Sequence, residues 1–305
     1  MKSIVFGSTG LVGSSLMRES KKQGLDFEGF SSKNLDLLNR DDVTSFFLKH
    51  RPSLVILAAA RVGGIGANST FPVEFLSQNV QIQTNVMDAA FKAETQKLVF
   101  LGSSCIYPRN ATQPIMEESL LTGPLEPTNS AYAVAKISGI ELVRAYRRQY
   151  GLHWISLMPT NLYGPNDNFD LLSSHVLPAL IRRFAEGKAN SSQKITLWGT
   201  GKPRREFMHV DDFAAATVHA LKFYDEDLPL NIGVGSDQTV EEVANLVREC
   251  AGYTGEISWD ATKPDGVPRK VLDVSRLKAI GFTPMISLEE GVEKTLRWFR
   301  EANGL

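Results

Sequence analysis

Three side chains in this sequence have the types and spacing needed for proton exchange with a substrate oxygen. Tyr132 and Lys136 stand four residues apart in a helical pattern, so their phenol and ammonium groups share one helix face. Free tyrosine titrates at about pH 10, and a nearby ammonium is expected to lower the pKa of the phenol by stabilising the phenolate. Ser103 follows the apolar run 98–101, at the carboxyl end of a predicted strand, where open α/β sheets bind ligands. A Tyr/Lys pair alone is usually just part of a helix surface, but with Ser103 and the glycine loop described next it predicts a catalytic site.

A glycine-rich loop separates the apolar run 4–6 from a helical pattern that extends to about residue 23. It comprises Gly7, Ser8, Thr9, Gly10, Leu11, Val12 and Gly13. Glycine is needed where a turn is tight and where backbone approaches a pyrophosphate, and the following helix N-terminus presents free N–H groups to that anion. The loop therefore predicts dinucleotide binding; the alternative is a tight structural turn.

The end of the second predicted strand indicates which dinucleotide binds. An acidic residue there bonds the ribose of NAD, but the segment reads Phe30-Ser31-Ser32-Lys33. The hydroxyl of Ser32 and the charge of Lys33 suit the 2′-phosphate of NADP(H), which is the predicted cofactor. The alternative is that Lys33 is an ordinary solvated lysine. Because the carboxylate of Asp36 is nearby in the sequence, NAD remains an alternative cofactor.

The composition of the chain excludes several classes of protein. Lys plus Arg is 33 and Asp plus Glu is 34 in 305 residues, so no charge surplus exists for binding nucleic acid. The apolar share of 43% is typical of globular proteins, and the length suggests about two domains. Two cysteines cannot form a disulfide framework, no metal-ligand cluster is visible, and the longest apolar run is Leu54–Ala60. No signal peptide is seen, so we expect a cytoplasmic enzyme without membrane or nucleic-acid partners.

The order of elements predicts the fold that positions these residues. Apolar runs over 4–6, 27–30, 53–58, 98–101 and 154–158 alternate with helical patterns over 41–50, 80–93 and 131–150. This alternation of strands and helices is typical of an α/β fold with a doubly wound, Rossmann-type parallel sheet. After residue 165 we expect loops over 166–174, 189–193 and 263–268, and helices over 175–186, 241–250 and 288–301. Strand-like runs over 206–210 and 230–233 are expected to return to the first sheet. The predicted domains are an NADP-binding domain (1–164, with 207–233 returning to it) and a smaller C-terminal substrate-binding domain (165–206 and 234–305).

Several motifs in one order resemble the extended short-chain dehydrogenase/reductase family over nearly the whole chain. They are AAARVGG at 58–64, LGSSCIYP at 101–108, PTNLYGP at 159–165, SHV at 174–176 and REFMHVDD at 205–212. The resemblance is closest to the members that convert GDP-4-keto-6-deoxy-D-mannose by epimerisation at C3 and C5 and NADPH-dependent reduction at C4. It implies further cofactor contacts from Asp36, Leu37, Ala59, Ala60, Leu101, Gly102, Lys136, Pro159, Asn161, Leu162 and His175. One departure is Ser32, where such members often carry an arginine for the 2′-phosphate.

The resemblance also maps an acid/base pair for the epimerisation onto Cys105 and His175. Cysteine and histidine titrate near ~8.5 and ~6.5, so both exchange protons near neutral pH. Tyr132 is then expected to protonate the C4 oxygen, with Ser103 hydrogen-bonded to that oxygen. Cys250, His50, His153 and His219 are interpreted as structural, and His209 has no predicted role.

The same resemblance implies how the GDP-sugar substrate is held. Arg183 and Arg205 suit the diphosphate, Trp198 could line the nucleotide pocket, and Asp265 could bond the ribose or the base. It also implies a homodimer through the helix 131–150, which carries Val134, Ile137 and Val143; a helix docked on its own sheet would look the same. Two alternatives stay open: another nucleotide-sugar epimerase or reductase of this fold, and a non-catalytic NADP-binding regulatory protein. A dehydratase should carry an acidic pair near Ser103–Cys105, and a regulatory protein should have lost Tyr132, Lys136 or Ser103.

Overall fold

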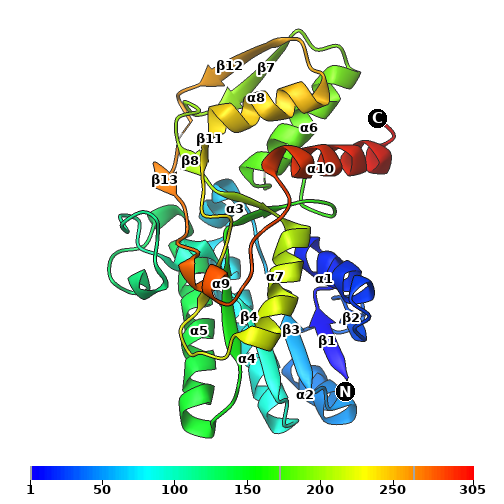
Figure 1. Cartoon of the computed structure of the whole chain (residues 1–305), viewed down its shortest axis with the longest axis vertical. Helices are drawn as coiled ribbons and strands as arrows, with labels where there is room; N and C mark the ends of the chain where they lie inside the picture. Colours follow the sequence, from blue (N-terminus) through cyan, green and yellow to red (C-terminus); the bar gives the residue numbers. More distant parts are fainter. Residues whose placement is uncertain (1, 172, 264) are drawn as a thin grey trace.

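A parallel sheet of six strands forms the centre of the molecule (Figure 1), in the order β10-β5-β4-β3-β1-β2. The computed structural model describes residues 2–171, 173–263 and 265–305. The strands are β1 (Ser3–Phe6), β2 (Phe27–Phe30), β3 (Leu54–Leu57), β4 (Lys97–Leu101), β5 (Ile155–Pro159) and β10 (Leu230–Ile232). Strands β1, β3, β4 and β5 are buried almost throughout, which explains their continuous apolar sequences. The predicted doubly wound α/β sheet is confirmed.

Helices cover both faces of this sheet. Helix α1 (Leu11–Lys22) packs against α7 (Val210–Phe223), while α4 (Pro72–Lys92) packs between α2 (Arg40–His50) and α5 (Ser130–Tyr150) (Figure 1). Helices α4 and α5 run parallel, because Phe75 contacts Tyr132 near their starts and Phe91 contacts Tyr150 near their ends. Helix α5, which carries Tyr132 and Lys136, is thereby held along its length.

The parallel register brings the functional segments together at one edge. Phe6 lies opposite Phe30 and Leu57, and Leu101 lies opposite Leu157, so the segments after β1, β2, β3, β4 and β5 all leave from the carboxyl edge. Strand order reverses between β1 and β3, and the glycine loop leaves β1 at that point. Such a reversal is where open α/β sheets bind their ligands.

A second, smaller hydrophobic core lies above this edge. It is formed by α6 (Val176–Ala189), α8 (Val240–Ala251) and α10 (Leu288–Asn303), with the parallel pair β7 (Lys194–Trp198) and β12 (Glu256–Asp260) (Figure 1). Between the two cores lie α3 (Ile65–Thr70) and the short strands β6 (Asn161–Tyr163), β8 (Arg204–Arg205), β9 (Phe207–His209), β11 (Gln238–Thr239) and β13 (Arg269–Lys270). Helix α9 (Ser275–Ala279) returns to the first core through Leu277. On this packing we propose the domain division near residue 164, with 207–233 returning to the first core apart from Phe207, which packs in the second, and with the residues around Leu277 joined to the first core.

Some predicted elements differ from the structure. The helix predicted over 80–93 begins at Pro72, where proline occupies the first helical turn; the Gly-, Asn-, Ser- and Thr-rich residues before it resemble a loop. Of the two runs expected to return to the first sheet, residues 230–232 do join it. Residues 207–209 instead pair with β6 in a separate two-stranded sheet. The residues that follow them form helix α7, which was not predicted. Helix α6 extends to Ala189, into the predicted loop 189–193. Leu172 and Pro264, within the predicted loops 166–174 and 263–268, lie outside the described residues.

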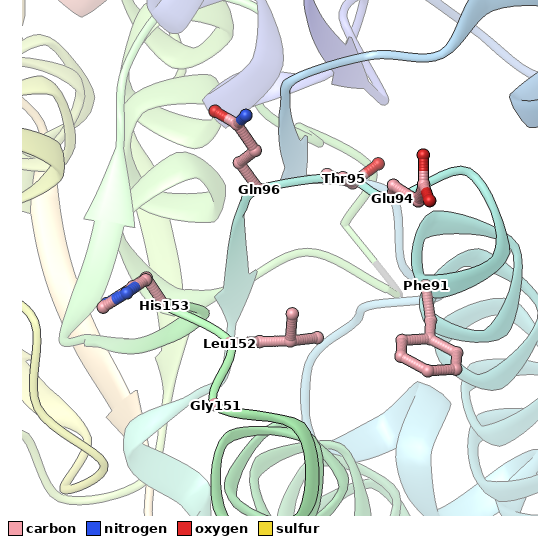
Figure 2. A pocket seen from close by; sticks show the side chains of 7 residues that line it. All are labelled: Phe91, Glu94, Thr95, Gln96, Gly151, Leu152 and His153. Carbon is pink, nitrogen blue, oxygen red and sulfur yellow. The ribbon is translucent and has the colours of Figure 1, made fainter.

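A surface pocket lies at the opposite, amino-terminal edge of the sheet (Figure 2). It is lined by Phe91, Glu94, Thr95, Gln96, Gly151, Leu152 and His153, just before β4 and β5 begin. It is therefore separate from the edge that carries the predicted site. Among the described residues, no helix has the length and apolarity needed to cross a bilayer.

Candidate active site

The glycine loop forms a cradle at the start of α1. Gly7 has a φ of 82°, and its N–H donates to the carbonyl of Phe30 at 2.8 Å. A Cβ on Gly7 would lie 2.8 Å from the backbone of Ala58, and one on Gly13 only 2.0 Å from the carbonyl oxygen of Gly7. Helix α1 has no side-chain cap and no acidic residue in its first turn, so its first N–H groups are left for an anion. The loop thus fits the pyrophosphate of a dinucleotide.

The segment after β2 fits the phosphate end of the predicted cofactor. Ser32 and Lys33 are exposed, and within the described part of the chain Lys33 has no acidic partner. Asp36 is also exposed, but its carboxylate accepts the N–H of Leu38 at 3.0 Å and so closes its own turn. Leu37 is buried. A free cation and a free hydroxyl match a 2′-phosphate better than a ribose hydroxyl.

The Tyr132 and Lys136 side chains both point from α5 into the protein. Tyr132 is 9% exposed, and burial raises its pKa well above the ordinary value, although the neighbouring Ser103 hydroxyl opposes this shift. Lys136 is 4% exposed and donates to the carbonyl of Leu101 at 2.7 Å, and burial lowers its pKa to about 7. The expectation that Lys136 lowers the pKa of Tyr132 is therefore wrong here, because burial disfavours the charged form of both groups. Tyr132 is a neutral phenol, the form that donates a proton.

Cys105 lies one short turn from Ser103, beside a lysine that the sequence did not indicate. Its N–H donates to the Ser103 hydroxyl at 3.3 Å, at the start of a 3₁₀ turn over Ser104–Ile106. The Nζ of Lys270 lies 3.6 Å from the Cys105 Sγ. In the sequence Lys270 follows a Pro/Gly loop, where a lysine is ordinarily solvated. Only its pairing in β13 opposite Arg205 shows that it lies close to Cys105.

His175 and Arg205 complete the group around Cys105. His175 precedes the first turn of α6; although solvent reaches its side chain, desolvation by the surrounding protein and then the charge of Lys270 lower its pKa. Desolvation also lowers the pKa of Arg205, whereas interactions with Cys105 and Asp265 raise it. A thiol, a neutral imidazole and two cations therefore gather next to the Ser103–Tyr132 pair.

The predicted substrate residues fall into two sets. Arg205 donates to the carbonyl of Asp265 at 3.4 Å, and both Asp265 carboxylate oxygens accept from Thr200, each at 2.7 Å. Trp198 is 55% exposed, with the Lys263 ammonium 5.5 Å from its ring centre. Arg183, on α6, is partly buried, and among the described residues it makes no ion pair and no hydrogen bond to the other three.

The remaining predicted cofactor residues lie along the same edge. Ala59 and Ala60 follow β3, Leu101 ends β4 and Gly102 follows it, and Pro159 ends β5. Asn161 and Leu162 belong to β6, and the Asn161 side chain donates to the carbonyl of Glu206 at 2.8 Å. The fold therefore brings the backbone of all these residues to one region, next to the glycine cradle.

These features are those of a dinucleotide-binding α/β protein in which buried Tyr132 and Lys136 lie beside Ser103 at the carboxyl edge of the sheet. The chain belongs to the NAD dependent epimerase/dehydratase family, whose model matches residues 3–233. It is 52% identical to GDP-L-fucose synthase 1 of Arabidopsis thaliana, over 98% of this chain and 93% of that protein. It is 47% identical to GDP-L-fucose synthase of Escherichia coli, over 97% of this chain and 96% of that protein. A GDP-L-fucose synthetase structure from Naegleria fowleri, bound to NADP, matches 99% of this chain and 94% of its own, with a TM-score of 0.91 and 29% identity.

Proposed function

We propose that this enzyme is an NADP-dependent GDP-L-fucose synthase that converts GDP-4-keto-6-deoxy-D-mannose into GDP-L-fucose. It first inverts C3 and C5 and then reduces C4. The high identity to proteins of that name over almost the whole chain supports this function. The observation that carries it is the position of Cys105: a reductase needs Ser103 and Tyr132, whereas an added thiol and imidazole provide for inversion at carbon.

The inversion uses the acidity that the C4 ketone confers on C3–H and C5–H. A base takes the proton, the C–H electrons move into the carbonyl, and the enolate oxygen is stabilised by hydrogen bonds from Ser103 and the neutral phenol of Tyr132. A second group then returns a proton to the opposite face of the carbon. Cys105 and His175 form this pair, and the lowered pKa of His175 keeps its imidazole neutral and able to accept a proton.

The reduction uses the same oxygen at C4. When bound, NADPH supplies the hydride that reduces C4. Tyr132 donates its phenolic proton to the oxygen, which suits the raised pKa of the group. Lys136, held by the carbonyl of Leu101, is placed one helical turn away to orient the cofactor ribose.

The cofactor and the substrate are held by separate groups. The glycine cradle with Ser32 and Lys33 binds NADP(H), and the segments after β3, β4 and β5 line the rest of its site. Arg183 and Arg205 bind the diphosphate of the GDP-sugar, while Trp198 and Asp265 bind the nucleoside. Lys270 adds a second cation beside Arg205.

We further infer a homodimer that forms through α4 and α5. Ile137 and Val143 are buried in the chain's own core, but Val73, Leu76 and Val134 are exposed on these neighbouring helices. Light scattering should give twice the chain mass, and the double variant Val73→Glu/Val134→Glu should give the monomer. We place the enzyme in the cytoplasm, because Cys105 is a free thiol that must stay reduced to exchange protons.

The experiment that tests this function mixes the protein with GDP-4-keto-6-deoxy-D-mannose and NADPH in deuterated water. We expect NADPH consumption and deuterium at C3 and C5 of the product. Consumption without exchange would indicate a plain C4 reductase. No consumption by folded protein that binds NADPH would overturn the proposal.

A further inference from the structure

Four cations are concentrated on two very short strands above the active site. Strands β13 and β8 lie side by side (Figure 1) and run parallel, and their register places Arg269 opposite Arg204 and Lys270 opposite Arg205. Two backbone bonds join them, from Arg204 N–H to the Pro268 carbonyl at 2.8 Å and from Glu206 N–H to the Lys270 carbonyl at 3.3 Å. Like charges that face each other across a strand pair repel, and so short a pair has little stability of its own. Something else must hold β13 against β8.

Asp237 holds one face of this pair. Its side chain is only 4% exposed, and its two carboxylate oxygens accept from Arg204 Nε at 2.9 Å and Arg269 Nε at 2.5 Å. Its backbone carbonyl accepts a further bond from Arg204 at 2.9 Å. Asp237 therefore ties β13 to β8 and offsets one of the two positive charges on this face, and a second carboxylate, Glu242, lies 3.9 Å from Arg204 Nη1.

Glu206 holds the chain on the other side of Lys270. Its side chain is fully buried, and one carboxylate oxygen accepts the N–H groups of Val234 and Gly235 at 2.6 and 2.7 Å. The other accepts the N–H of Leu272 at 2.9 Å. Lys270 thus lies in the chain between Arg269, which the buried carboxylate of Asp237 holds, and Leu272, which the buried carboxylate of Glu206 holds.

The opposite face of the pair has no such neutralisation. Strand alternation directs Arg205 and Lys270 away from Asp237, and the Lys270 ammonium lies 3.6 Å from the Cys105 Sγ. Among the described residues neither cation pairs with a carboxylate, and the side-chain bonds of Arg205 go to the carbonyls of Arg204 and Asp265. These two charges are left for an anionic ligand next to the reacting thiol.

We propose that Asp237 and Glu206 are positioning residues that hold β13 against β8, so that Lys270 and Arg205 remain together beside Cys105. The consequence for catalysis rests on the proposed function, since it assumes that the GDP-sugar is the anion these cations meet. The placement of Lys270 itself is tested without that assumption.

The first test measures the charge beside Cys105 by alkylation of the whole protein. Anionic iodoacetate and neutral iodoacetamide are compared at Cys105 by mass spectrometry, with Cys250 as the internal reference. The iodoacetate preference is the ratio of the alkylation rates with iodoacetate and with iodoacetamide. Removing one unit charge about 4 Å from the reacting group should lower this ratio about fivefold. Lys270→Met gives the iodoacetate preference when the ammonium is absent. In Arg269→Gln and Asp237→Asn we expect the preference to decrease most of the way to that value.

Arg269→Gln is the more informative variant, because Arg269 is exposed and Asp237 keeps its bond to Arg204. The matched control for Asp237→Asn is Asp225→Asn, which removes a carboxylate that also pairs with two cations, Arg147 and Lys97, and bonds His153, at the far end of the sheet. A wild-type iodoacetate preference in folded Arg269→Gln would overturn the positioning role, as would an equal loss in Asp225→Asn.

The second test separates positioning from a general loss of structure. Arg269→Gln should raise the KM for the GDP-keto-sugar several-fold more than it lowers kcat, with an unchanged Kd for NADPH. An unchanged KM would contradict the catalytic consequence. If the wild-type enzyme does not turn over this substrate, the proposed function fails, and the alkylation result still decides the placement of Lys270.

Discussion

His209 should make the stability of this enzyme fall steeply as the solution becomes acidic. The residue ends β9 and caps α7, where its Nδ1 accepts the N–H of Asp211 at 3.2 Å. Its side chain is 2% exposed, packs edge-on against Tyr163, and has no partner for Nε2 among the described residues. Burial lowers the pKa of His209 to about 4, although the charge of Asp211 opposes this shift. Protonation would also remove the lone pair that accepts the cap hydrogen bond.

The size of the effect follows from the two pKa values. Histidine titrates near 6.5 in the unfolded chain and at about 4 in the folded one, so the unfolded state binds more protons between these values. The contribution of neutral His209 to stability is complete above pH 6.5 and is lost as the pH falls towards 4. At about 1.4 kcal/mol per unit, the total loss is about 3 kcal/mol, of which about 2 kcal/mol is reached by pH 5.

The assay compares the wild type with His209→Asn in urea unfolding, followed by tryptophan fluorescence at pH 7.5 and pH 5. Asparagine is a good helix cap that does not titrate in this range. The smaller side chain will lower the free energy of unfolding at both pH values, and this cost cancels in the comparison. We expect the wild type to lose about 2 kcal/mol more than the variant between pH 7.5 and pH 5.

Burial also raises the pKa of other acids, such as Glu206 and Asp212, but these groups are present in both proteins, so their contribution to the pH dependence cancels in the comparison. Equal losses in the wild type and His209→Asn would refute the reasoning. A larger loss in the variant would show that the charged ring is stabilised in the folded protein.

Three further predictions concern the active site. Tyr132→Phe should lower NADPH consumption by at least about 100-fold, because the proton donor is lost, while measurable C3 and C5 exchange should remain; normal consumption would remove Tyr132 from the reduction. Cys105→Ser should slow incorporation of deuterium at C3 and C5, measured by NMR of the product, and wild-type exchange would exclude the thiol as an acid or base. Gly13→Ala should abolish NADPH binding in a fluorescence titration, since the added Cβ would lie 2.0 Å from the Gly7 carbonyl; normal binding by a folded variant would contradict the cradle.

Features that depend on local sequence were predictable. The buried strands β1, β3 and β4 are short apolar runs, and their parallel order follows from the helices between them. Residues that directly follow such strands, including Gly7 and Ser103, therefore had to meet at one edge of the sheet. The start of α4 was not predictable in the same way, because Pro72 and the small polar residues before it are equally common in loops.

Short elements between the two cores were the least predictable. Strand β9 resembles a strand of the main sheet in composition, but it pairs with β6, and a run of three residues carries no signal that distinguishes the two partners. His209 illustrates the same limit. Its motif could be recognised, whereas its role as a helix cap depends on where α7 begins.

The sequence by itself determined the class of fold, the dinucleotide cradle and the Ser103, Tyr132 and Lys136 group, because these depend on periodicity and on spacings of a few residues. Only the tertiary structure placed Lys270 beside Cys105, since the two are 165 residues apart and meet through the register of β13 on β8. It also decided that the pKa of Tyr132 is raised. The spacing of Tyr132 and Lys136 brings a charge near the phenol, but the desolvation that outweighs it comes from the whole packed fold.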